Sequence, residues 1–233
     1  MSNLLEIPDD VMRIILEKSD YFGIQSLRKT CHHLRNFIDD VLPSPNTVSL
    51  GINVAEKSIN LEIESRNSKN LVYWKYQDPE FSESFFRDFQ IFLEFFKSQK
   101  LPLEIFSINF STRNSSKFLE NFGKTGFLKT TKISLRVFNE IETFGILKMM
   151  DSNFLENIEI ENSTWENYIL QTEEIRNSEQ WKNAKIAEIY RFDIWSPSIF
   201  SNFEKSKGYC IDLAPEDVAL LKEVSSFRIL EFF

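Results

Sequence analysis

The chain has 233 residues, of which 42% are hydrophobic, so it is long enough to bury a core of its own. Its 27 basic and 35 acidic residues give a net charge of -8, which argues against a surface built to bind nucleic acid phosphates. The two cysteines do not suggest a secreted disulfide framework, the first residues lack a signal-peptide pattern, and no apolar run approaches the ~20 residues of a membrane span. These features predict a soluble globular protein of the cytoplasm, the nucleus or both, with no nucleic acid or membrane as partner.

The first forty residues predict two amphipathic helices. Pro8 followed by two aspartates is a typical helix start, because proline fits the first helical turn and acidic groups there complement the helix dipole. "SDYFG" at 19–23 separates the helices, and "LPSPN" at 42–46 predicts the end of a small helical module. The apolar residues recur at helical spacing, and there are more of them than two short helices can bury against each other. They are Val11, Ile14 and Ile15 in the first helix, and Ile24, Leu27, Cys31, Leu34 and Ile38 in the second.

After residue 46 the apolar pattern changes to a period of two. The runs "TVSLGINV" and "INLEIE" alternate, and "LVYWKY" is a third apolar and aromatic run, so the three predict an antiparallel meander. Residues 81–100 then predict one strongly amphipathic helix that ends before Pro102. Its apolar stripe is predicted to be core and not a ligand pocket, and consists of Phe85, Phe89, Phe92, Leu93 and Phe96.

A strand-and-helix repeat follows from about residue 101 to residue 233. Short strand-like runs end at Ile108, Leu135, Ile160 and Ile189, with differences in residue number of 27, 25 and 29. Helix-like segments separate them, at 115–126, 138–151 and 164–183, and two further units are expected at 208–224 and 227–233. This period predicts a leucine-rich-repeat-like α/β solenoid, in which helices cover one face of a parallel sheet. The whole chain is therefore expected to be α/β (α+β overall), with an antiparallel strand region at the start of the solenoid.

The sequence contains no motif for catalysis or cofactor binding. His32 and His33 are the only histidines, and neighbours on a helix point about 100° apart, so they do not form a chelating pair. Cys31 before them is expected to be a buried helix cysteine, because a Cys–His dyad needs spatial opposition and a third positioned group. The glycines form no phosphate-binding loop. We therefore expect no enzyme activity, no cofactor and no metal site.

The apolar N-terminal segment resembles the F-box motif without a gap. The matching residues are Ile7 to Val11, Ile14 to Leu16, Ile24, Leu27, Arg28, Cys31, Leu34, Arg35 and Ile38. The remainder is similar to the FTH domain that follows such F-boxes in a large nematode family, through "LVYWKYQD", "PLEIFSINF", "FLENIEIEN", "EQWKNAKIAEI" and "PEDVALLKEV". The resemblance implies two domains, an F-box at 1–45 and an FTH-like substrate-recognition domain at 46–233.

This resemblance implies a non-enzymatic substrate-recognition subunit of a Skp-cullin-F-box ubiquitin ligase. The N-terminal helices would bind a Skp-family adaptor, and through it a cullin, while the second domain would bind an unknown target protein. Two residues depart from the family pattern: Ile7 replaces leucine, and Leu34 replaces an aromatic residue, which removes on the order of 1–3 kcal/mol of contact. The residues expected to bind the adaptor are Ile7, Pro8, Val11, Ile15, Leu16, Leu27 and Leu34.

The alternative is a self-contained protein-interaction scaffold. In that hypothesis the F-box-like helices only cap the solenoid, and no Skp-family adaptor binds. Periodicity identifies the apolar residues but not which of them hold the helices together and which remain for a partner.

Overall fold

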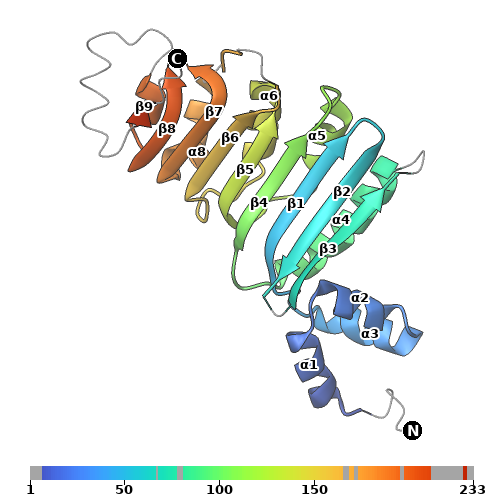
Figure 1. The fold of residues 1–233 in the computed structure, drawn as a ribbon. Coiled ribbons are helices and arrows are strands. Elements are labelled where there is room, and N and C mark those ends of the chain that lie inside the picture. Colours follow the sequence, from blue (N-terminus) through green and yellow to red (C-terminus); the bar gives the residue numbers. More distant parts are fainter. Residues whose placement is uncertain are drawn as a thin grey trace.

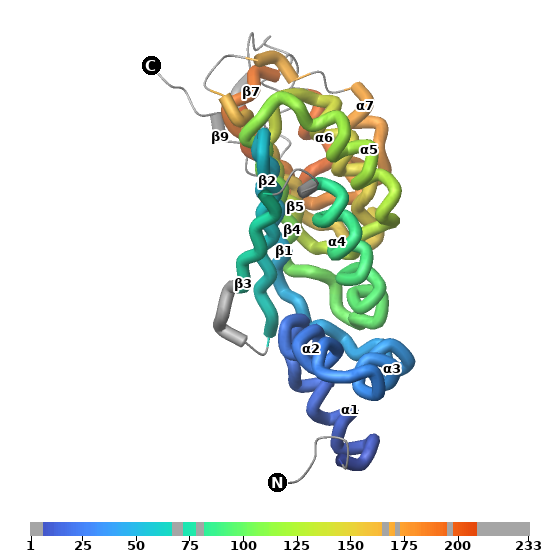
Figure 2. The backbone as a smooth tube through the Cα atoms, turned by 90° about the vertical axis from the view of Figure 1, so that its right-hand side faces the viewer, coloured from blue at the N-terminus to red at the C-terminus, as the bar shows by residue number. Residues whose placement is uncertain are grey.

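The structure is a computed structural model that describes residues 7–66, 68–77, 81–164, 168–170, 173–194, 197–210 and 228–229. The described strands form one open nine-stranded sheet in the order β3-β2-β1-β4-β5-β6-β7-β8-β9. The N-terminal helices lie beyond one end of this sheet (Figure 1). Seen from the side, α4, α5, α6 and α7 all lie on one face of the sheet, and no described helix covers the other face (Figure 2).

Three helices, not two, form the N-terminal module: α1 (Asp9–Lys18), α2 (Tyr21–Arg28) and α3 (His32–Val41). The expected break at 19–23 is shorter, because the Asp20 side chain accepts a 2.7 Å hydrogen bond from the Gly23 N–H and so starts α2 at once. The single helix expected from Ile24 to Ile38 is wrong. Cys31 has extended backbone angles, φ −158° and ψ 164°, and is the N-terminal cap residue of α3. The chain is therefore not helical at Cys31, and α2 and α3 are separate helices.

The period-two segments form the predicted antiparallel meander: β1 (Thr47–Ala55), β2 (Ser58–Ser65) and β3 (Ser68–Tyr76). Helix α4 (Phe81–Lys97) then crosses back over one face, and β4 (Leu103–Phe110) pairs parallel to β1. The predicted apolar stripe of α4 is confirmed as core, because all five of its side chains are buried. Phe85, Phe89, Phe92 and Phe96 stack in sequence, with ring centroids 5.3, 6.1 and 6.0 Å apart.

The strand-and-helix repeat has the predicted alignment. Ile108 pairs with Leu135, Leu135 with Ile160, and Ile160 with Ile189, always between parallel neighbours. The elements are α5 (Ser116–Phe122), β5 (Thr130–Val137), α6 (Glu140–Leu147), β6 (Asn157–Asn162), α7 (Glu173–Asn177), α8 (Glu179–Asn183), β7 (Ile186–Ile194), the 3-10 helix η2 (Pro197–Phe200), β8 (Lys205–Cys210) and β9 (Arg228–Ile229).

Two parts of the repeat differ from the expected pattern. The helix expected at 164–183 is two short helices, because the Ser178 side chain accepts a hydrogen bond from the Trp181 N–H and starts α8 separately. Ile169 forms a parallel bridge with Asp193 of β7 and is therefore extended, not helical. Of the unit expected at 208–224, residues 211–224 lie outside the described residues, and β9 begins the last expected unit.

A buried carboxylate links two consecutive repeats. Glu142 in the first turn of α6 is almost fully buried. Its two oxygens accept hydrogen bonds from the Ser115 hydroxyl, 2.5 Å away, and from the Phe138 backbone N–H, 2.6 Å away. Burial raises the pKa of this carboxyl above its ordinary range, although both hydrogen bonds act to lower it. Glu142 therefore joins the start of α5 to the start of α6.

Replacing Glu142 by alanine is expected to lower the free energy of unfolding by about 1–3 kcal/mol, because it leaves two buried donors without their acceptor. The raised pKa also sets a pH dependence. A carboxyl with a folded-state pKa above its unfolded value stabilises the fold at pH below the unfolded pKa and loses this contribution as the pH rises through the folded pKa. In urea unfolding, wild type should therefore gain stability relative to Glu142→Gln as the pH falls from 7 toward 4. Exposed Glu83→Gln should show no such trend, and a trend of opposite sign would contradict the assignment.

Candidate functional site

Helix α1 carries apolar side chains on two opposite faces. Met12 and Leu16, four residues apart, are buried against the rest of the chain. Val11, Ile14 and Ile15 lie on the other side, where 45%, 51% and 36% of their surfaces are exposed. Residues spaced by three and four lie on one helical face, so these three form a continuous apolar strip. We call Val11, Ile14 and Ile15 the α1 strip.

The start of α1 is fixed without a side-chain cap. Pro8 is the N-terminal cap residue, and its carbonyl oxygen accepts hydrogen bonds from the Val11 and Met12 N–H groups, both at 3.0 Å. Asp9 and Asp10 occupy the first turn, where negative charge complements the helix dipole. Pro8 itself is exposed, and therefore extends the apolar surface of the α1 strip toward the N-terminus.

Helices α2 and α3 pack as a hairpin behind α1. Ile24, Leu34 and Ile38 are buried between them, and Leu27 is half-buried. Arg28 of α2 makes a bidentate ion pair with Asp39 of α3, with Nε to Oδ1 at 2.6 Å and Nη2 to Oδ2 at 3.1 Å. Arg28 has a raised pKa because of this hydrogen bond. The hairpin thus has its own internal contacts, and the ring of Phe37 in α3 lies 5.5 Å from the guanidinium of Arg13 in α1.

An aromatic cluster joins the helical module to the sheet. Tyr21, the first residue of α2, is almost fully buried, and its ring lies 5.0 Å from Phe92 and 6.3 Å from Phe95 of α4. Trp74 of β3 packs edge-on against both Tyr21 and Phe22, at 5.7 and 4.8 Å. Burial, and secondarily the charge of Asp88, raises the pKa of the Tyr21 phenol, so the hydroxyl remains protonated. The helical module is therefore packed onto the sheet and not merely tethered to it.

The connection to β1 is also held by specific contacts. Pro43 and Pro45 are buried, and the Asn46 side-chain amide donates a 2.9 Å hydrogen bond to the Glu17 carbonyl of α1. The Gln99 side chain both accepts from the Thr47 N–H and donates to the Thr47 carbonyl, at 2.8 Å each. The Gln99 amide thus pairs with the backbone of Thr47 as a residue of a neighbouring strand would. This pairing fixes the direction in which the chain leaves the helices and enters β1.

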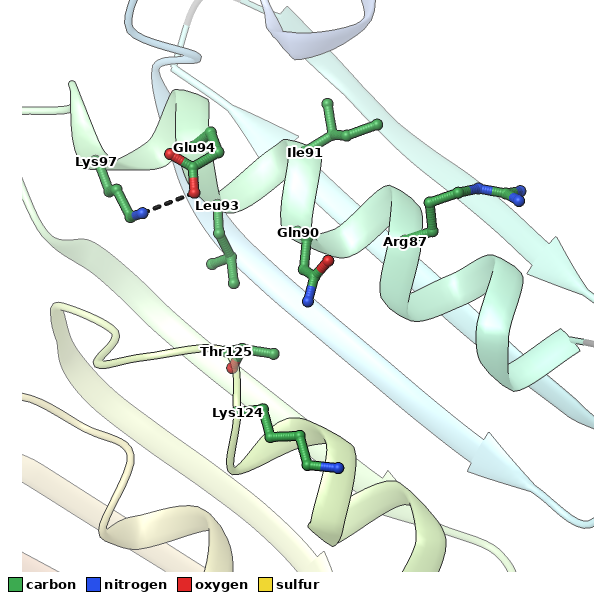
Figure 3. A pocket seen from close by; sticks show the side chains of 8 residues that line it. All are labelled: Arg87, Gln90, Ile91, Leu93, Glu94, Lys97, Lys124 and Thr125. Carbon is green, nitrogen blue, oxygen red and sulfur yellow. Dashed lines mark hydrogen bonds and ion pairs between the residues drawn. The ribbon is translucent and has the colours of Figure 1, made fainter.

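The helical layer contains a groove with the size of a ligand site. It has a volume of about 450 Å³ and lies between α4 and the end of α5 (Figure 3). Its basic side chains are already paired: Lys97 with Glu94 at 2.7 Å, and Lys124 with Glu120 at 2.8 Å. In the part of the chain that the structure describes, no group of three or more His, Cys, Asp or Glu is placed to hold a metal. No helix among those residues is long and apolar enough to cross a membrane.

Comparison with protein-family models gives two matches along the chain. Residues 4–44 match the F-box domain, and residues 112–225 match the FTH domain. The chain thus combines an F-box domain with an FTH domain, which matches the F-box plus FTH family. Searches of the curated proteins and of the solved structures gave no significant match. Proteins of this family are of the adaptor type and are generally not enzymes, and the F-box suggests substrate recognition for a ubiquitin ligase complex.

Within the F-box, the residues expected to bind an adaptor separate into three groups. Pro8, Val11 and Ile15 are exposed, whereas Ile7 and Leu27 are half-buried. Leu16 and Leu34 are buried inside this chain, because they face the core between the three helices. Both leucines therefore pack within the F-box, and their contact with an adaptor stays a prediction.

Two important residues were missing from the expected set. Ile14 is the most exposed member of the α1 strip, and its spacing from Val11 was the available signal. Tyr21 was assigned to the break between helices, and no pattern in the sequence shows that it contacts α4 about seventy residues later.

Proposed function

We propose that this chain is the substrate-recognition subunit of a Skp-cullin-F-box ubiquitin ligase. The observation that carries the proposal is the α1 strip: three branched apolar side chains remain exposed on a short helix whose opposite face is already buried. Fully burying a side chain of this kind contributes about 1.5–3 kcal/mol, so an exposed strip of three is a substantial source of binding energy. The proposed adaptor surface consists of Ile7, Pro8, Val11, Ile14, Ile15 and Leu27.

The second half of the proposal concerns the target protein. Strands from β1 to β9 belong to one continuous sheet, which supports treating residues 46–233 as one recognition domain, including the strands before the FTH match. The regular pairing of β4 to β7 and the helices on one face support a leucine-rich-repeat-like solenoid with an uncovered sheet face. We infer that this domain holds a target protein near the conjugating enzyme, which raises the effective concentration without any chemistry in this chain.

The proposed partners follow from this role. A Skp-family adaptor contacts the F-box directly, and a cullin is reached only through that adaptor. The role needs no cofactor, nucleic acid or membrane, and it places the protein in the cytoplasm, the nucleus or both. It also assigns no catalytic residue.

One observation favours the alternative of a scaffold with a helical cap. Tyr21 and Phe22 pack against Trp74, so the F-box helices do cover apolar surface of the sheet domain. This contact uses the start of α2, however, and leaves the α1 strip uncovered. The cap and the adaptor surface are therefore different sides of the same module.

Co-expression with a Skp-family adaptor tests the proposal. The full chain is expected to elute with the adaptor as a one-to-one complex, and addition of a cullin and a conjugating enzyme should give ubiquitin transfer to a target captured by residues 46–233. A full chain that is folded but elutes separately from the adaptor at micromolar concentration would favour the scaffold alternative.

A further inference from the structure

Strand β3 is the edge of the sheet on the side of the F-box. It pairs with β2 only, and the strand order places no described strand beyond it. Figure 2 looks toward this edge: β3 lies in front, α4 stands to one side of it and α2 below. An edge strand has backbone N–H and C=O groups that point away from its sheet and can pair with another extended chain.

The two edges of the sheet differ in length. At the far edge, the described part of β9 has two residues, whereas β3 has nine. Proteins commonly protect sheet edges with short strands, prolines or bulges. Strand β3 contains no proline. Its pairing with β2 is regular from Ile59 with Tyr76 to Ile63 with Val72, and the register shifts between Ile63 and Ser65, near the start of β3. The regular part of this edge, from Val72 to Tyr76, is able to accept a further strand.

The chemistry of β3 selects the kind of strand. Its sequence, SKNLVYWKY, contains two lysines and no acidic residue, in a chain whose net charge is -8. Lys75 is exposed, and among the described residues it makes no ion pair. Its neighbour on β2 is the uncharged Asn60. Glu62 of β2 lies opposite Tyr73, so the positive charge of this edge is concentrated at Lys75, where it complements an acidic side chain of an added segment.

Aromatic side chains provide apolar contact beside the same edge. Tyr73 has half of its surface exposed, at 50%. Tyr76 packs against Phe85 of α4, so strand alternation places Tyr73 on the opposite face of the sheet. Trp74 and Tyr76 are partly buried on the other face. Tyrosine and tryptophan are favoured anchors at protein interfaces. The backbone of an added strand would thus form hydrogen bonds with β3, and its side chains would contact aromatic side chains on both faces of the sheet.

We propose that the target protein docks by adding an extended segment with acidic side chains to the edge of β3. This inference rests on the proposed role as a substrate-recognition subunit. Trp74 of the same strand contacts Tyr21 and Phe22 of the F-box, so a segment bound to β3 lies directly beside the module that binds the adaptor. Pairing of β3 with a second copy of this chain is less favourable, because both edges carry lysines and both chains carry a net charge of -8.

The test uses the full chain and a capped octapeptide of alternating glutamate and valine as the probe. Two control peptides have alternating lysine and valine, or the glutamate–valine sequence with alternate backbone nitrogens methylated. The glutamate–valine peptide is expected to slow hydrogen exchange of the β3 amides. Calorimetry should give a Kd that Lys75→Glu weakens about fivefold, the upper end of what one exposed ion pair contributes. Exposed Lys117→Glu on α5 changes the net charge equally and should leave the Kd unchanged.

Three outcomes would overturn the docking proposal: no protection of β3 by the glutamate–valine peptide, equal protection by either control peptide, or a dimer in sedimentation whose β3 amides are already protected. Adaptor binding is measured on the same samples. If the adaptor binds and β3 remains unprotected, the docking proposal fails alone. If β3 is protected and the adaptor does not bind, the ubiquitin ligase role fails instead.

Discussion

Replacing Pro8 by alanine and Val11 by aspartate is expected to weaken binding of a Skp-family adaptor at least about 100-fold, or roughly 3 kcal/mol. The aspartate would lie in the middle of the apolar surface that the adaptor covers, and burying an unpaired carboxylate costs several kcal/mol. The fold should be unaffected, because Val11 is exposed and lies in the first turn of α1, where a negative charge complements the helix dipole. Calorimetry gives the Kd, and thermal unfolding gives the Tm.

The matched control is Lys57→Asp, in the exposed turn between β1 and β2 at the opposite end of the sheet from the F-box (Figure 1). It also makes the chain more acidic, and should leave adaptor binding unchanged. An unchanged Kd for the double variant would show that the α1 strip is not the adaptor surface. A lowered Tm would instead show that Val11 contributes to folding.

Tyr21→Ala is expected to lower the free energy of unfolding by about 3–5 kcal/mol, the range for removing a large buried ring. Tyr21 contacts Trp74, Phe92 and Phe95, so its loss leaves a cavity at the junction of the F-box and the sheet domain. Tyr21→Phe keeps the ring and should cost less than about 1 kcal/mol. Urea unfolding gives the free energies, and hydrogen exchange of α2 reports the local loosening.

Exposed Tyr73→Ala is the control for loss of a tyrosine ring and should change stability by no more than about 0.5 kcal/mol. If Tyr21→Ala were as stable as wild type, the F-box would not be packed onto the sheet in solution. If Tyr21→Phe were as destabilising as the alanine variant, the phenol hydroxyl and not the ring would hold the junction.

The repeat could be predicted from the sequence because its strands must bury one side. Apolar residues at alternate positions place Ile108, Leu135, Ile160 and Ile189 toward the helices, and the structure pairs these residues in that order. The Phe stripe of α4 was predictable for the same reason, since its 3.6-residue period leaves one face for the core. These signals are local, and each repeats often enough to be recognised.

The adaptor surface was only partly predictable, because α1 is apolar on two faces. Leu16 and Ile15 are adjacent in sequence, but one is buried and the other exposed, and only the position of the α2–α3 hairpin decides which. The helix expected from Ile24 to Ile38 is two helices because of single residues. The Asp20 cap sets where α2 begins, and the extended Cys31 sets where α3 begins. Long-range contacts such as Tyr21 with Phe92 leave no period in the sequence.

From β4 onward, the strand order makes the position of a strand in the sequence correspond to its distance from the F-box. From β4 to β9 every successive strand is added on the side of β1 away from β2 and β3, and the F-box packs on β3 and α4. Each step moves a docking site by about 4.8 Å, so the six steps from β1 to β9 displace it by about 29 Å. Under the proposed function, the strand that holds a target would therefore set how far the lysines of that target lie from the ubiquitin-loaded enzyme.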